Sequence, residues 1–97
     1  MKEKETQIKR IEAMEGRFDE SVAAVKELSA ALDRYEAVQE DIAALKEYYG
    51  SKAWKKDYAD DESGRLPEGL KRGVLSEDGL WNLLSEEGEL KERLKEI

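Results

Sequence analysis

Residues 8–49 read IKRIEAMEGRFDESVAAVKELSAALDRYEAVQEDIAALKEYY and place apolar side chains at steps of three, four or seven residues. This spacing keeps the side chains on one face of an α-helix, whereas a half-buried strand would alternate apolar and polar residues. The apolar face consists of Ile8, Ile11, Phe18, Val22, Val25, Leu28, Leu32, Tyr35, Ile42, Leu45 and Tyr49. No proline interrupts the stretch, and we predict one long helix over about residues 5–49.

The apolar face of this helix drifts steadily around the helix axis. A seven-residue repeat slips by about 20° per heptad on a straight helix, and such a drift favours a gentle left-handed supercoil. Most carboxylates lie off this face, and Glu15 is an exception. Because helices in proteins gain most of their stability by packing an amphipathic face, another element must cover this one. We therefore expect coiled-coil-like packing.

A short second helix is expected over about residues 51–61. Gly50 follows two tyrosines and suits the left-handed position that commonly ends a helix. Ser51 is a favourable N-cap residue for the helix that follows. Trp54 and Tyr58 are four positions apart and would share one face of it.

Residues 62–75 form a connection that is too apolar for a free linker. Pro67 can open a single helical turn, and glycines punctuate the rest. The apolar residues of the connection are Leu66, Leu70, Val74 and Leu75. We expect a structured connection that packs on the helices.

The last helix is expected over about residues 76–96. Ser76 is a favourable N-cap, and the acidic residues after it suit the positive end of the helix dipole. Leu75 and Leu80 have the spacing of a hydrophobic staple. The sequence thus predicts an all-α fold, a single domain over residues 1–97, with this helix antiparallel to the first.

The two longer helices differ in length, and this difference predicts self-association. At about 1.5 Å per residue the first helix would be roughly 60 Å long and the last roughly 30 Å. The uncovered part would present a self-association stripe, which consists of Ile8, Ile11, Phe18, Val22 and Val25. An exposed apolar surface of this size usually marks an interface, and a second copy is the simplest cover. A bend near Gly16 that lets the chain cover itself is the alternative.

Charge and composition exclude several classes of function. The formal net charge is −7, which disfavours binding to nucleic acid and to anionic membrane surfaces. There is no cysteine, no apolar signal segment and no stretch of membrane-spanning length. We expect a cytoplasmic protein that binds neither nucleic acid nor membranes.

The residue inventory also bears on catalysis. The absence of histidine and cysteine removes the usual zinc sites and nucleophile pairs, and no glycine-rich phosphate loop is present. We expect no cofactor. Carboxylate pairs at helical spacing are Glu12/Glu15, Glu36/Glu40 and Glu89/Glu92. They leave open a small magnesium-dependent enzyme acting on a phosphorylated or nucleotide substrate, if carboxylates from different helices converge.

An aromatic cluster with neighbouring basic residues is the candidate partner-binding surface. It consists of Tyr48, Tyr49, Trp54, Tyr58 and Trp81, with Lys71 and Arg72 at its rim. Tryptophan and tyrosine dominate interface hot spots. The alternative is that these rings fill the junction where three helices meet, because aromatics carry large buried area.

From Tyr48 onward the sequence resembles a known family. The matching text is Tyr48-Tyr49-Gly50-Ser51, Trp54, Asp57-Tyr58, Asp61-Glu62, Gly64, Leu66-Pro67 and Leu70-Lys71-Arg72-Gly73-Val74-Leu75-Ser76-Glu77-Asp78. These residues resemble the short bacterial proteins grouped as domain of unknown function 4298. The Arg10-Ile11-Glu12 and Tyr35-Glu36 segments extend the likeness, while Gly16, Gly79 and Gly88 depart from it. The resemblance implies a bacterial, cytoplasmic setting and points to no particular activity, substrate or ligand. We expect a non-catalytic interaction module that works as a homodimer.

Overall fold

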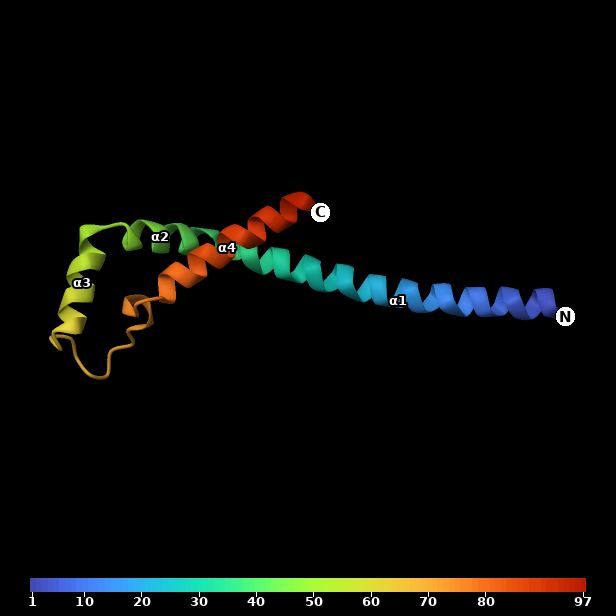
Figure 1. Ribbon diagram of the computed structural model, residues 1–97, viewed down its shortest axis with the longest axis horizontal. Helices are drawn as coiled ribbons and strands as arrows, with labels where there is room; N and C mark the ends of the chain where they lie inside the picture. Colours follow the sequence, from blue (N-terminus) through green and yellow to red (C-terminus); the bar gives the residue numbers. More distant parts are fainter. The chain divides into compact units, whose positions relative to one another are not determined.

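The computed structural model describes all residues from 1 to 97 and confirms an all-α fold without strands. In chain order the elements are α1 (Lys2–Ala37), α2 (Gln39–Tyr49), α3 (Lys52–Glu62), the 3-10 turn η1 (Gly73–Leu75) and α4 (Gly79–Glu96) (Figure 1). None of the helices combines the length and the hydropathy that a membrane span requires.

The stretch expected as one long helix is two helices separated by Val38. This residue has φ −104° and ψ 9°, outside the helical region, and its N–H is 3.2 Å from the carbonyl oxygen of Tyr35. Glu40 and Asp41 then lie in the first turn of α2, where the helix dipole favours negative charge. A single non-helical residue hardly disturbs the apolar spacing, so the pattern predicted helix on both sides but not the interruption.

The chain falls into two compact units, Met1–Val38 and Gln39–Ile97. Unit 1 consists of α1, in which no residue is buried. Unit 2 contains all the other elements. A single domain over the whole chain, and a last helix antiparallel to the entire first stretch, therefore stay predictions.

Unit 2 has a small core of its own. The most buried apolar side chains are Ile42 of α2, Leu75 of η1 and Leu80 of α4, with exposed fractions of 9%, 6% and 3%. The chain turns at α3 and comes back through η1, so that α4 contacts both α2 and η1 (Figure 1). The two leucines expected to form a staple are thus both in this core.

The connection between α3 and η1 packs less completely than its composition suggested. Leu75 is buried and Leu66 is half-buried, but Leu70 and Val74 are exposed. The expected turn at Pro67 is present, with the Leu70 N–H 3.2 Å from the Pro67 carbonyl oxygen.

The predicted N-cap of α3 is confirmed, and the predicted conformation of the glycine before it is not. The Ser51 hydroxyl accepts a hydrogen bond from the Trp54 N–H at 3.2 Å, as an N-cap should. The left-handed conformation expected at Gly50 is wrong, because Gly64, after α3, is the one residue with a positive φ, +70°. Gly50 instead donates its N–H to the Lys46 carbonyl at 3.2 Å.

The start of α4 lies at Gly79, three residues later than expected. The Ser76 hydroxyl still accepts the Gly79 N–H at 3.0 Å, so the capping contact forms although the residues between make a turn. A Cβ atom at Gly79 would lie 2.7 Å from the Gly73 carbonyl oxygen and closer still to the Ser76 hydroxyl. Glycine at this position therefore lets η1 and α4 approach closely.

Candidate functional site

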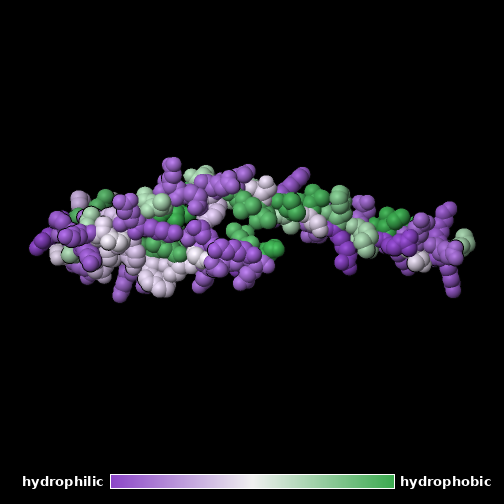
Figure 2. Space-filling model, turned by 90° about the horizontal axis from the view of Figure 1, so that it is seen from above, coloured by the Kyte–Doolittle hydropathy of each residue, from purple (hydrophilic) through white to green (hydrophobic).

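The self-association stripe lies on α1 and is fully accessible within unit 1. Phe18 and Val25 are 63% and 66% exposed, and the other three residues of the stripe are exposed as well. Met14, Leu28 and Leu32 extend the apolar surface, which appears as green atoms along α1 in Figure 2. The helix continues through Gly16, where an added Cβ would meet nothing within 4 Å. The structure thus offers no bend at this glycine.

Three of the predicted aromatic residues meet in unit 2. Tyr49, at the end of α2, and Trp54, in α3, pack edge to face with ring centroids 4.9 Å apart. Trp54 also stacks on Tyr58, one turn further along α3, at 5.2 Å. Aromatic pairs in these arrangements are favourable beyond the area that they bury. Trp54 therefore joins α2 to α3.

Polar contacts fix the same rings to their surroundings. The Trp54 Nε1 donates a hydrogen bond to the Val74 carbonyl in η1 at 3.0 Å. The Tyr48 hydroxyl donates to the Asp57 carboxylate at 2.6 Å, and this bond, with burial and the charge of Asp57, raises the pKa of Tyr48 to about 12. The charge of Glu62 is the main cause that raises the pKa of Tyr58. These contacts tie α2, α3 and η1 together.

The remaining residues of the candidate partner-binding surface lie apart from these rings. Arg72 donates to the Asp61 carboxylate at 2.8 Å, which joins the connection to α3. Lys71 is exposed and forms no ion pair. Trp81 is 59% exposed and makes no ring contact. The structure thus brings Tyr49, Trp54 and Tyr58 together and leaves Trp81 on the surface of α4, while Tyr48 reaches α3 only through its hydrogen bond to Asp57.

One feature of unit 2 was not foreseen among the candidate residues. Glu87 of α4 is 7% exposed, and its carboxylate lies 3.7 Å from the Lys46 Nζ of α2 and 3.1 Å from the Lys91 Nζ. The four-residue spacing of Glu87 and Lys91 is visible in the sequence, but the approach of Lys46 is not. The three side chains join α2 to α4 by charge next to the core.

The acidic pairs that left open a magnesium enzyme do not converge. No group of three or more acidic side chains is placed to hold a metal ion. The pairs lie on α1, on α1 and α2, and on α4, respectively. The enzyme alternative therefore has no geometric observation in its favour.

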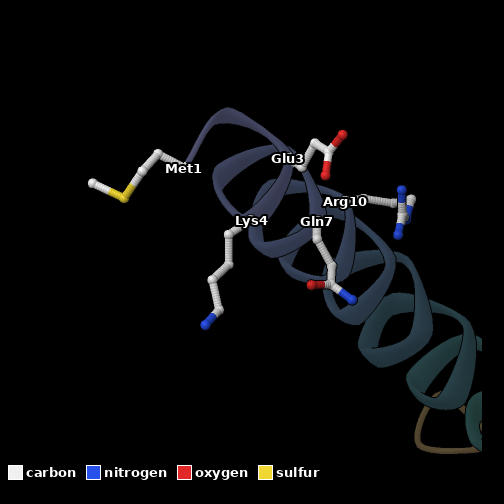
Figure 3. A pocket seen from close by; sticks show the side chains of 5 residues that line it. All are labelled: Met1, Glu3, Lys4, Gln7 and Arg10. Carbon is white, nitrogen blue, oxygen red and sulfur yellow. The ribbon is translucent and has the colours of Figure 1, made fainter.

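A shallow hollow at the N-terminal end of α1 is lined by Met1, Glu3, Lys4, Gln7 and Arg10 (Figure 3). All five residues come from the first turns of a single helix, and their side chains diverge from the ribbon in Figure 3. A binding site needs groups that converge on a ligand. The side chains around this hollow do not converge in that way, so it is not a candidate binding site.

Comparison with known proteins gives one match. The family model described as "Domain of unknown function (DUF4298)" matches residues 11–97. Comparison with curated proteins and with solved structures found no match. The matched range contains the aromatic rings, the core of unit 2 and most of α1.

Proposed function

The chain belongs to the DUF4298 family, and we propose that it is a non-catalytic protein-interaction module that works as a homodimer. The observation that carries the proposal is α1, a helix of 36 residues with an apolar face and no buried residue. We also propose a cytoplasmic, bacterial setting, which rests on the cysteine-free sequence and on the resemblance.

The physical argument concerns the cover of the apolar face of α1. A helix alone in water is only marginally stable, because its stability comes mainly from burying its apolar side. Seven large aliphatic or aromatic residues of α1 remain exposed in one chain: Ile8, Ile11, Phe18, Val22, Val25, Leu28 and Leu32. A second copy supplies an identical face, and closed two-fold pairs are the commonest protein assemblies. Dimerisation would bury these residues.

The aromatic residues divide between structure and recognition in this proposal. Tyr48 and Trp54 are engaged in contacts that hold unit 2 together. Trp81 and Lys71 are exposed, and exposed tryptophan is a frequent anchor of protein interfaces. A partner protein other than a second copy would therefore meet unit 2 at Trp81.

Sedimentation or light scattering over a range of concentrations tests the dimer. We expect a mass twice the 11.1 kDa of one chain. Phe18→Glu should give the monomer and reduce the helical circular dichroism, because it places a charge in the stripe. Ala23→Glu adds the same charge on the opposite side of α1 and should leave the dimer intact. An 11.1 kDa particle at all concentrations, with α1 fully helical, would refute the proposal.

A further inference from the structure

We propose that α1 packs side by side with α1 of a second copy in antiparallel orientation, with the start of each helix beside the end of the other. In this arrangement, the end-to-end alignment, Phe18 faces Val22 of the second copy. This inference rests on the proposed homodimer and adds the orientation and register of its interface. It comes from the charged residues that interrupt the apolar face of α1.

The apolar face of α1 fits a heptad repeat with two core positions, a and d. The a positions are Ile8, Glu15, Val22, Ser29 and Glu36, and the d positions are Lys4, Ile11, Phe18, Val25 and Leu32. Three core positions therefore hold charged side chains. All ten residues lie within α1, which runs without interruption from Lys2 to Ala37.

A parallel, in-register pair would place each core residue against its own counterpart. Lys4 would face Lys4, Glu15 would face Glu15, and Glu36 would face Glu36. Like charges held together between two helices are destabilising, and removal from water makes them more so. The parallel pair thus has a repulsive contact at both ends and one in between.

In an antiparallel pair, each residue at an a position faces a residue at a d position of the second helix. In the end-to-end alignment, this removes the like-charge contacts of the parallel pair. Lys4 faces Glu36 of the second copy, and the two-fold axis repeats this pair at the other end. Glu15 then faces Val25 instead of another carboxylate.

The apolar residues are matched in the same alignment. Ile8 faces Leu32 of the second copy, and Phe18 faces Val22 on both sides of the two-fold axis. On one flank Met14 faces Leu28, and both are exposed in the single chain. On the opposite flank Glu12 faces Lys26 of the second copy, while Glu5 faces Asp33 and Asp19 faces Asp19. These like-charge and unlike-charge pairs are exposed to water, where each contributes little. The pairing thus covers the ends and the centre of the apolar face.

Sliding the second copy by one heptad loses these contacts. In one direction Glu36 faces Ile11 and Glu15 faces Leu32, so two carboxylates of each chain lie against apolar side chains, whereas in the end-to-end alignment only Glu15 does. In the other direction Glu36 extends beyond the end of the second helix and leaves Lys4 without a charge opposite. Of these three alignments, the end-to-end one gives the longest overlap along α1, which has 36 residues and a length of about 54 Å at about 1.5 Å per residue.

Cysteine cross-linking of the full chain tests the orientation, because the natural sequence contains no cysteine. Ile11→Cys and Ser29→Cys are mixed in equal amounts, allowed to exchange subunits and mildly oxidised. The antiparallel pair should give mainly the mixed disulfide, which mass spectrometry distinguishes by the two chain masses. Each variant alone should cross-link poorly, because its thiols would lie about 27 Å apart along the helix axis, 18 residues at about 1.5 Å each.

The outcomes separate this inference from the homodimer. A dimer in which each variant alone forms its own disulfide is parallel, which overturns the inference and leaves the homodimer standing. A mixed disulfide with Val22→Cys in place of Ser29→Cys overturns the end-to-end register. A wild-type chain that is monomeric by light scattering overturns both proposals.

A charge exchange gives a second test that leaves the apolar face intact. Lys4→Glu should weaken the dimer by about threefold to tenfold, because it creates two repulsive pairs with Glu36. The double variant Lys4→Glu/Glu36→Lys should restore the affinity of the natural chain. In a parallel pair Lys4→Glu exchanges one like-charge contact for another, so an unchanged affinity would contradict the antiparallel arrangement.

Discussion

Units 1 and 2 carry apolar residues at the same helical spacing, but only unit 2 buries them. Phe18 in α1 is 63% exposed, whereas Ile42 in α2, on the continuation of the same apolar face, is 9% exposed. Within unit 2, α3, η1 and α4 return to surround the core, while unit 1 contains α1 alone. Spacing therefore determines the helix and its apolar face, whereas burial depends on which neighbouring segments the chain supplies.

Carboxylates next to apolar side chains differ between the two units in the same way as the apolar residues do. Glu87 is buried in unit 2, and two lysine ammonium groups compensate its charge. Glu15 also lies on an apolar face, but α1 has no neighbour within its unit and Glu15 is exposed. A carboxylate at the edge of a core thus needs partners that only tertiary structure can bring.

The largest expected effect comes from removing core volume in unit 2. Leu80→Ala should lower the free energy of unfolding by about 2–5 kcal/mol, because Leu80 is 3% exposed and its removal leaves a cavity. The same change at Leu28 of α1 should cost less than about 1 kcal/mol at concentrations where the chain is monomeric. Urea unfolding followed by tryptophan fluorescence and by circular dichroism measures both. Equal losses at the two sites would break the contrast between the units.

A smaller effect is expected when the buried carboxylate loses its charge. Glu87→Gln should lower the free energy of unfolding by about 1–3 kcal/mol, because it removes charge-assisted contacts with Lys46 and Lys91. Glu20→Gln, on the polar side of α1, is the matched control and should change the free energy of unfolding by less than about 0.5 kcal/mol. Urea unfolding at low and high salt measures how much of this loss in the free energy of unfolding is electrostatic. A loss no greater than that of the control would show that Glu87 contributes no stability.

The smallest effect is confined to alkaline pH. The hydrogen bond to Asp57 raises the pKa of Tyr48 to about 12, above the unfolded value of 10.0. The stabilisation is therefore fully present below pH 10 and is lost as the pH rises towards 12. Absorbance titration should show two of the four tyrosines ionising late, Tyr48 near pH 12 and Tyr58, whose pKa is also raised, and Tyr48→Phe should remove the step near pH 12. A step near pH 12 that persists in Tyr48→Phe would assign it to another tyrosine.

Several local features could be predicted because they depend on neighbours in the chain. Ser51 caps α3, and Trp54 stacks on Tyr58, four residues later on the same helix. Leu75 and Leu80 are both buried, although α4 begins at Gly79 and not next to Ser76, where a staple would need it to begin. Each depends on residues within about five positions, for which helix geometry fixes the relative placement.

Other features depend on contacts that spacing cannot reveal. The interruption at Val38 changes one residue and leaves the apolar periodicity in place. The close approach at Gly79 depends on Gly73, and the burial of Glu87 depends on Lys46 of another helix. The sequence showed each residue but not its distant neighbour.

The spacing of residues along the chain is enough to predict an all-helical protein with a long apolar face and an acidic surface. This is possible because a helix is built from contacts three and four residues apart. Which part of the apolar face is buried depends on tertiary contacts, since burial requires segments distant in sequence to return to it. Within unit 2 they return to α2 through α4, whereas unit 1 consists of α1 alone and buries none of its residues.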